Sequence, residues 1–596
     1  MGVACALSIL LLAGGCKSKH RKTRSAENTD KYADTLQKIV AAHHLPKEML
    51  DSAKMQGLRW PDFSDYQASV ARFYDDRNYE VAWTRDGKPT ASANAFLQQF
   101  QQADAKGLIP EDYDASRWAD RVEKLKSGSD DAISGFDVAM TVTVMRYISD
   151  LRIGRVNPSH FNFDIHVEDK KYDLAGFVSD NAVDATDVPK LIASMEPDSA
   201  QYRATEAALG HYLELAKQQA ASPQLSAPLP MVDKPVSAGE AYPAVDALLA
   251  RLQLEGDVAA TTTPDDANAP HKHIFDATLS DGVKSYQHRH GITEDGKLTP
   301  QTVKSLNVPL TARVVQLQDS LERWRWLPDP YLNAPLMVNL PEFILRGYSR
   351  DDHKLEFTMR TVVGQVKGDH ETPVFTHMMR YLVFRPYWNV PQSIIKKEIV
   401  PHLSADPDYL RTHNYEVTNS KGDVLTNYTL HQVAHGGVLV REQPGPKNSL
   451  GLIKFMFPNQ YDIYLHSTPA PYLFARTRRD FSHGCVRVQK PEDLAVWVLD
   501  GQEDWNKDSK KAEDWDIDRV HDAMTNGPDN KTLSLKTPIP IVIFYLTAIV
   551  AEDGQAHFFD DIYGYDAELQ KVLSKGPPYP VKPEPVKVKT KPGDTV

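Results

Sequence analysis

Apolar residues recur at helical spacing through the first half of the chain. In the run DVAMTVTVMRYISDL they fall at intervals of three and four, which predicts a helix with one apolar face. The positions are Val138, Val142, Met145 and Ile148. Similar stripes alternate with turns over residues 61–217, which we expect to form a helical scaffold domain. Its aromatic core candidates are Phe73, Tyr74, Trp83 and Tyr113.

Three shorter helices are predicted in residues 241–308. Apolar stripes from Val245 and from Leu279 follow helical spacing and mark the first two. Thr299 is a plausible N-cap with Pro300 at the first helical position, so a third helix is expected there. A linker rich in Pro, Ser and Ala (218–240) precedes this small domain, and a connecting helix (309–330) follows it.

The pattern changes from residue 331 onward. Short runs of β-branched and aromatic residues, bounded by Pro, Gly and Asp, predict the strands of a largely β domain over 331–575. A later helix begins near Pro491 and is expected to face inward with Leu494, Trp497 and Val498. The predicted fold class is therefore α+β and multi-domain, with a helical scaffold, a small three-helix domain and a mostly β domain.

The two ends of the chain differ from these domains. Residues 1–16 form an apolar leader that is shorter than the roughly 20 residues of a membrane span but suits an export signal. Small residues before Cys16 resemble a lipobox and predict lipidation there, although no basic residue precedes the run and Ala13 stands where Leu is usual. A plain signal peptide or a misplaced start codon are alternatives. A tether and first helix (17–60) follow the leader, and the Pro/Lys-rich tail (576–596) is expected to be disordered.

Charge and cysteine content narrow the possible functions. The 596 residues carry a net charge of −12 and no long basic block beyond Lys17–Arg24, which argues against nucleic-acid binding. We expect contact with a membrane only through the lipid anchor, and a location in the periplasm or cell envelope. Of three cysteines, Cys5 and Cys16 lie in the leader, so Cys485 is expected to be the only thiol of the mature chain.

Cys485 lies in the run Ser482-His483-Gly484-Cys485-Val486-Arg487. A thiol with a pKa of about 8.5 needs a neighbouring base to supply the thiolate near neutral pH. Both His483 and His466 could be that base, because the first is two residues away and the second ends a separate predicted strand. Backbone N–H groups of Gly484 and Cys485 could stabilise an oxyanion. A zinc site formed by the two histidines and the cysteine is an alternative.

The spacing of these residues resembles a known family. A His, eighteen residues, and then SHGC followed by a hydrophobic residue and Arg are similar to the YkuD-type L,D-transpeptidases. The stretches PYWNVPQSIIKKEIVP and REQPGPKNSLGLIKFMFPNQYDIYLHST resemble its long, multi-domain YcbB-type branch. The run VKSYQHRHGITEDGKLTPQTVKSL resembles a peptidoglycan-binding domain, for which a helical spacer that binds nothing is the alternative. The whole resemblance covers roughly residues 63–573.

The resemblance implies roles for individual residues. Cys485 would be the nucleophile and His466 the general base, oriented by the backbone carbonyl of Ser467. Arg487 would occupy a position that shorter relatives fill with Asn, and residues 391–430 would form a mobile cap over the substrate groove. The remaining implied site residues, of which Tyr387 could equally be packing within a strand, are Ser482, His483, Gly484, Tyr387, Trp388, Asn389 and Tyr464.

The resemblance also implies a reaction without metal or cofactor. The thiolate would attack the third residue of a peptidoglycan tetrapeptide stem, release the terminal D-Ala, and pass the acyl group to an acceptor stem as a 3→3 crosslink. Carbapenems would acylate the same thiol. The alternatives are an L,D-carboxypeptidase, an enzyme that anchors proteins to the wall, and a wall-binding lipoprotein without activity.

Overall fold

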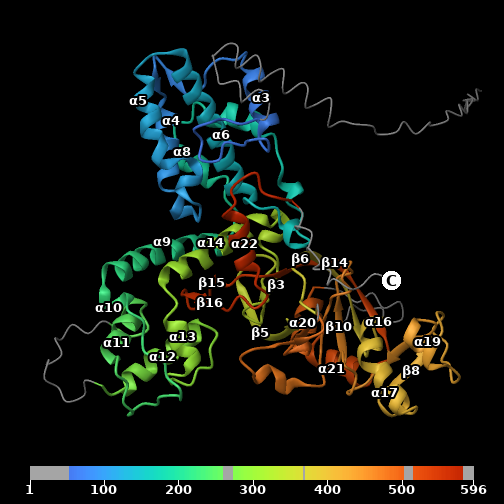
Figure 1. Ribbon diagram of the computed structural model, residues 1–596. Coiled ribbons are helices and arrows are strands. Elements are labelled where there is room, and N and C mark those ends of the chain that lie inside the picture. Colours follow the sequence, from blue (N-terminus) through green and yellow to red (C-terminus); the bar gives the residue numbers. More distant parts are fainter. Residues whose placement is uncertain (1–52, 260–272, 367–369, 502–513, 582–596) are drawn as a thin grey trace, which may run out of the picture. The chain divides into compact units, whose positions relative to one another are not determined.

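The computed structural model describes residues 53–259, 273–366, 370–501 and 514–581 (Figure 1). The leader, Cys5, Cys16 and most of the predicted tail lie outside the described residues. The chain divides into two compact units. The first comprises residues 1–94, 117–145 and 173–186, and the second comprises residues 95–116, 146–172 and 187–596.

The first unit is built from helices around the start of a long central helix, α6 (Asp130–Ile153). Asp137 on α6 is buried and accepts hydrogen bonds from Tyr74 Oη (2.7 Å) and from the backbone N–H of Ala82 and Trp83. The predicted single apolar face is wrong in detail, because α6 is buried around its whole circumference from residue 136 to residue 148. The four predicted aromatic core residues are buried, as expected. The other elements along this stretch of chain are α3 (Gln67–Asp76), β1 (Thr84–Arg85), β2 (Lys88–Pro89), α4 (Ala91–Gln101), α5 (Trp118–Leu125) and α7 (Leu174–Phe177).

The second unit contains two long helices that run side by side, α9 (Ala200–Ala221) and α14 (Leu310–Trp326) (Figure 1). Leu209 of α9 and Leu317 of α14 are fully buried in the core that these helices share with the β domain. The chain between them forms the three predicted short helices, with Thr299 capping the third through the N–H of Thr302. These helices and their neighbours are α8 (Val188–Ala193), α10 (Pro223–Ser226), α11 (Val245–Leu254), α12 (Ala277–Arg289) and α13 (Pro300–Leu306).

The β domain is a nine-stranded sheet that closes on itself. Its order is β12-β5-β13-β11-β10-β6-β14-β3-β4, and β4 pairs back onto β5. The inward-facing residues of these strands are almost all buried, which makes the barrel interior part of the main core. The strands are β3 (Leu336–Asn339), β4 (Ile344–Tyr348), β5 (Leu355–Gly364), β6 (Phe375–Phe384), β10 (Ile453–Met456), β11 (Leu465–His466), β12 (Asp480–Ser482), β13 (Val486–Val488) and β14 (Lys531–Phe544).

Three helices follow β13 or β14 along the chain: α20 (Pro491–Leu499), α21 (Ile517–Thr525) and α22 (Tyr565–Leu573). A hairpin between β14 and α22 is formed by β15 (Ala548–Val550) and β16 (Ala556–Phe558). Leu494 and Val498 of α20 face inward as predicted. Trp497 is partly buried against the same core, and its indole N–H donates to Glu356 at 2.5 Å. The predicted multi-domain fold class, with a helical N-terminal region and a β-rich domain, is confirmed.

An inserted segment between β6 and β10 folds around its own small core. Three strands pair in the order β7-β9-β8, and the helices of the segment pack with them around buried Val, Ile and Leu residues. We call residues 388–442 the cap segment, since β7 and β9 lie beyond the two ends of the predicted range 391–430. Its elements are β7 (Trp388–Asn389), α16 (Gln392–Ile394), the π-helical turn η7 (Ile395–Ile399), α17 (Val400–Ala405), α18 (Tyr409–Thr412), β8 (Tyr415–Thr418), α19 (Leu430–His435) and β9 (Leu439–Glu442).

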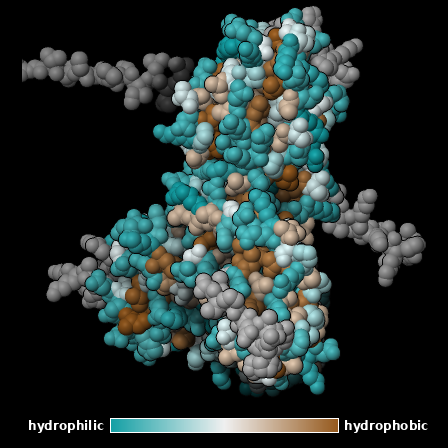
Figure 2. All heavy atoms as spheres, turned by 90° about the vertical axis from the view of Figure 1, so that its left-hand side faces the viewer, coloured by the Kyte–Doolittle hydropathy of each residue, from teal (hydrophilic) through white to brown (hydrophobic). Residues whose placement is uncertain are grey.

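The surface of the described chain is largely hydrophilic. Figure 2 shows separate brown patches on a mainly teal face. Among the described residues, no helix combines the length and the apolar character that crossing a bilayer requires.

Candidate active site

A groove of about 940 Å³ lies where the cap segment meets the barrel strands β10, β11 and β13. Cys485, His466 and His483 all line it. The other predicted residues that line it are Tyr387, Trp388, Asn389, Tyr464, Ser482 and Arg487. The structure therefore brings together, around one concavity, side chains that are up to 100 residues apart in the sequence.

The thiol sits on irregular backbone between β12 and β13. Gly484 adopts φ = +116°, a conformation that side chains other than glycine rarely allow, so the strand is broken just before Cys485. The loop is held by three hydrogen bonds: Gly484 N–H to Ser482 Oγ (3.1 Å), Ser482 Oγ–H to the Cys485 carbonyl (2.6 Å) and Thr372 Oγ1–H to the Gly484 carbonyl (2.7 Å). Ser482 thus fixes the loop, and the N–H of Gly484 is already engaged.

Lys454, His466 and Arg487 form a row across three neighbouring strands. Lys454 on β10 pairs with His466 on β11, and His466 pairs with Arg487 on β13. Residues directly opposite one another in a sheet project on the same face. A lysine and an arginine therefore flank the histidine within the groove wall.

This setting keeps the imidazole of His466 neutral. Burial and the charge of Arg487 lower the pKa of His466 to about 3, and the charge of Lys454 acts in the same direction. The Nδ1–H donates to the backbone carbonyl of Ser467 at 2.6 Å, which leaves Nε2 as the nitrogen able to accept a proton. His466 thus presents a ring of fixed orientation whose pKa lies well below its usual value.

The thiol of Cys485 is also neutral at rest. Burial raises its pKa to about 11, although the hydrogen bond to Tyr464 and the charge of Lys454 oppose that shift. The Sγ–H donates to the carbonyl of Asp462 at 3.6 Å, and the carboxylate of Asp462 raises the pKa further. The raised pKa of Cys485 and the lowered pKa of His466 both disfavour a resting pair of thiolate and imidazolium. The thiolate therefore forms only when the thiol passes its proton to a base.

His483 faces the cap segment. Its Nε2 contacts Glu398 Oε1 on η7 at 2.7 Å, and its ring lies edge-on to His370 with centroids 4.8 Å apart. The extended strand expected at this point would have directed His483 to the face of the thiol, but the turn at Gly484 changes its direction. Between the two histidines that the sequence left open, His466 has the buried, neutral, oriented ring that a base requires.

Lys454 and Glu398 are site residues that the sequence analysis missed. Lys454 lies in the quoted run LGLIKFMF, but only the register of β10 against β11 places it beside His466. Glu398 lies inside the predicted cap, but a charged residue on a helix is usually a solvated one. Its contact with His483 depends on a fold that pattern analysis does not provide.

The aromatic wall of the groove comes from β7 and from the residues directly before β7 and β11. Tyr387 stacks under the guanidinium of Arg441 at 4.0 Å, so it has a packing role as well as a groove position. Trp388 is half-buried and Asn389 is exposed on the same strand. Tyr464 is partly buried next to the thiol, and its pKa is raised by burial and by the proximity of Cys485.

The alternative of a zinc site at the thiol is not supported by the geometry. Over residues 53–259, 273–366, 370–501 and 514–581, the single group of His, Cys, Asp and Glu side chains close enough to share an ion lies elsewhere. His483 is paired with Glu398 instead of meeting His466 at the sulfur.

Comparisons with known proteins agree with this geometry. Residues 68–209 match the family described as "Scaffold domain", residues 242–306 match "Putative peptidoglycan binding domain", and residues 335–511 match the YkuD family, described as "L,D-transpeptidase catalytic domain". A Haemophilus influenzae protein named "Putative L,D-transpeptidase" is 30% identical over 285 residues, which is 46% of this chain and 54% of the relative. The chain thus spans about half the length of the curated relative that it matches. Its three matched segments are thus similar to a scaffold domain, to a putative peptidoglycan-binding domain and, around the thiol and imidazole described above, to the L,D-transpeptidase catalytic domain of the YkuD family.

Proposed function

We propose that this protein is a peptidoglycan L,D-transpeptidase that forms 3→3 crosslinks through a thioester on Cys485. The observation that carries the proposal is that a partly exposed thiol and an imidazole of fixed orientation line the same groove of about 940 Å³. The match of residues 335–511 to the L,D-transpeptidase catalytic domain supports the same reaction class.

The first step transfers an acyl group to sulfur. His466 Nε2 accepts the proton of the Cys485 thiol, and the sulfur forms a bond to the carbonyl carbon of the third stem residue, whose centre is L. The N–H of Cys485 and the hydroxyl of Tyr464 are the candidate donors to the developing oxyanion, since the N–H of Gly484 is engaged by Ser482. The C–N bond to the terminal D-Ala then breaks, and His466 returns the proton to the departing amine.

The second step releases the enzyme. The side-chain amine of the third residue in a second stem attacks the thioester, His466 accepts a proton from that amine, and the sulfur departs and is reprotonated. A new amide bond between two third residues is the 3→3 crosslink. No step requires a metal or a cofactor.

The charges of the groove fit an acidic donor peptide. Arg487 and Lys454 line the groove on either side of His466. The Nε–H of Arg487 is buried and forms no hydrogen bond within the part of the chain that the structure describes. Leaving such a donor unmet costs free energy, so a carboxylate of the stem is its expected partner.

The cap segment favours transfer over hydrolysis. Its contact with the catalytic loop through Glu398 and His483 closes one side of the groove. Excluding water from the thioester lets the acceptor amine compete, whereas an open groove would give an L,D-carboxypeptidase. The same chemistry with a protein lysine as acceptor would anchor proteins to the wall.

One assay distinguishes these outcomes. The purified chain is incubated with disaccharide-tetrapeptide, and the products are identified by mass spectrometry. Dimers lacking one D-Ala are expected, monomeric tripeptide alone would indicate hydrolysis, and unchanged substrate with a folded protein would indicate a binding role. Cys485→Ala should abolish both products, and a Cys485→Ala protein that still forms dimers would refute the proposal.

The identity of the base has its own matched pair of variants. His466→Asn is expected to slow formation of the thioester by about 10²–10⁴-fold, the usual contribution of a general base. His483→Asn should retain most of that rate, because His483 contacts Glu398 and does not lie between Lys454 and Arg487 on the barrel strands, as His466 does. Acylation by a carbapenem, followed by the mass of the intact protein, measures both rates without an acceptor.

The cell envelope is the proposed location, since the wall polymer would be the substrate of both the catalytic and the peptidoglycan-binding-type domain. We further propose that Cys16 carries a lipid anchor. Incorporation of labelled palmitate into the wild type but not into Cys16→Ala would test this.

A further inference from the structure

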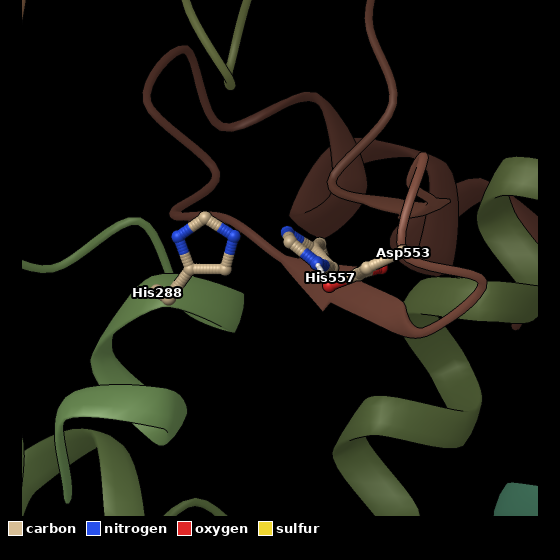
Figure 3. Close-up of side chains that lie close together, drawn as sticks. All are labelled: His288, Asp553 and His557. Carbon is tan, nitrogen blue, oxygen red and sulfur yellow. Dashed lines mark hydrogen bonds and ion pairs between the residues drawn. The ribbon is translucent and has the colours of Figure 1, made fainter. Parts of the chain in front are cut away.

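A second cluster of candidate ligands lies outside the catalytic groove. It consists of His288 on α12, His557 on β16 and Asp553 in the turn between β15 and β16, and Figure 3 shows the His288 ring facing His557 from the end of its helix. One potential ligand atom from each side chain lies within 4.8 Å of the other two. None of the three lines the groove around Cys485.

The two elements that carry these side chains are held together. Arg289 is buried, pairs with Asp257 through Nε at 3.0 Å, and donates from Nη1 to the carbonyl of Ala556 at 3.4 Å. The ring of His290 stacks on Phe558 with centroids 5.6 Å apart. Three consecutive residues at the C-terminal end of α12, including its C-cap His290, thus meet the three residues of β16, and His288 and His557 form the third contact, with centroids 5.1 Å apart.

Each ligand side chain is also oriented by a neighbour. Asp553 accepts the N–H of Gln555 on Oδ1 (2.9 Å) and contacts Nε2 of His557 through Oδ2 (2.9 Å). His288 contacts Glu294 Oε1 through Nδ1 at 3.0 Å, which leaves Nε2 as the free nitrogen of its ring. A carboxylate behind an imidazole is the usual outer partner of a metal-binding histidine.

We propose that His288, Asp553 and His557 bind a divalent transition-metal ion, with Zn²⁺ as the ion that fits the ligands best. Two imidazoles and a carboxylate suit zinc, copper or nickel and do not suit magnesium or calcium. Tetrahedral zinc with bonds of about 2.0–2.1 Å places its ligand atoms roughly 3.3 Å apart. Nε2 of His557 and Oδ2 of Asp553 lie 2.9 Å apart, close to that separation, and the ring of His288, with 54% of its side chain exposed, has room to turn toward them.

The ion takes the place of the hydrogen bond between His557 and Asp553. The ring of His557 binds it through the lone pair of Nε2, as a neutral imidazole with its proton on Nδ1. Both histidines line a cavity of about 700 Å³, which gives the ion a path and gives a water molecule the fourth position. His288 is the penultimate residue of α12, where the partial negative charge of the helix end favours a cation.

The consequence is a metal link between two domains. His288 belongs to the peptidoglycan-binding-type domain, and Asp553 and His557 belong to the hairpin that follows the barrel strand β14. A bound ion would add a strong contact at a junction that otherwise relies on Arg289 and His290.

The test uses the full chain with Cys485→Ala, so that the catalytic thiol does not compete for the ion. After treatment with EDTA, Zn²⁺ is titrated against a chromogenic chelator. One ion per chain is expected, with a rise of a few degrees in the midpoint of thermal unfolding at saturating zinc. His288→Gln should weaken binding by at least 100-fold, and Glu294→Gln, which removes only the outer partner, by about 10-fold.

His521→Gln is the matched control. His521 is exposed to a similar extent and contacts Glu492 at 3.1 Å, but it has no second histidine beside it. It should leave the zinc affinity unchanged. The proposal is overturned if no ion is retained at micromolar zinc, or if the affinity for zinc is the same in His288→Gln, Glu294→Gln and His521→Gln. Should His288→Gln fail to fold, the comparison of Glu294→Gln with His521→Gln decides alone.

Discussion

The pKa of the resting thiol gives the sharpest test of the active-site geometry. With burial raising the pKa of Cys485 to about 11 from a usual value of 9.0, the thiolate fraction below pH 9 is about 100-fold smaller than for an unperturbed cysteine. We therefore expect iodoacetamide to alkylate Cys485 about 100-fold more slowly than a free thiol at pH 7.5.

The pH dependence follows from the same values. His466, with a pKa near 3, stays neutral over the pH range of the assay. It therefore does not stabilise the thiolate at low pH, and the alkylation rate should show no plateau there. The alkylation rate should rise about tenfold per pH unit from pH 6 to pH 9 and level off only near pH 11. Intact-protein mass after short exposures measures the rate, with Cys485→Ala as the blank.

Two neighbouring charges provide a paired control. Lys454→Met removes a cation that lowers the pKa of the thiol, so the inflection in the plot of alkylation rate against pH should move to higher pH. Asp462→Asn removes an anion that raises the pKa of the thiol, so the inflection of the alkylation rate should move to lower pH. The backbone should keep its conformation in this variant, because Asn tolerates the φ of +54° found at Asp462. An inflection below pH 8 in the wild type, lost in His466→Asn, would show a stored thiolate–imidazolium pair and refute the reasoning.

Three other features lead to measurable outcomes. Glu398→Gln weakens the contact with His483. Because both side chains are partly exposed, we expect this contact to lose only about 0.2–1 kcal/mol, which would be measured as a higher ratio of hydrolysed to crosslinked product. Asp408→Asn, in an exposed ion pair on the same segment, should not change that ratio. Gly484→Ala forces a side chain onto backbone with φ = +116°, which strains the loop that carries Cys485. The rate of carbapenem acylation should fall by more than about tenfold, and the midpoint of thermal unfolding should fall little. An unchanged acylation rate would contradict the need for glycine at this position. Thr299→Ala removes the N-cap of α13 at a cost of about 1 kcal/mol, so amide exchange in that helix should accelerate about fivefold, and unchanged exchange would contradict the cap.

Much of the fold follows from local patterns. The spacing of Leu248 and Leu252, the stripe from Leu279 and the Thr299-Pro300 cap predict the three helices that the structure shows, because each depends on residues within a few positions of one another. The β-branched runs likewise predict the barrel strands. The closure of β4 onto β5 could not be predicted, since pairing between strands is set by long-range packing.

The candidate site divides in the same way. The short motif around Cys485 marks the thiol, and the resemblance selects His466, but neither gives the strand register that places Lys454 and Arg487 around the imidazole. The direction of His483 depends on the backbone turn at Gly484, which an extended-strand assumption misses. Trp497 follows the apolar period of α20 and packs against the core, but the hydrogen bond from its N–H to Glu356 depends on a strand that is distant in the sequence.

The protonated state of the thiol has a consequence for the lifetime of the protein. Peroxide and disulfide exchange attack thiolates and leave thiols nearly untouched. Under the proposed mechanism, Cys485 resists conversion to sulfenic acid and to mixed disulfides while it remains a thiol, and it becomes vulnerable only once a base takes its proton. At the proposed location in the cell envelope, without a reducing glutathione pool, this would keep the proposed nucleophile usable between turnovers.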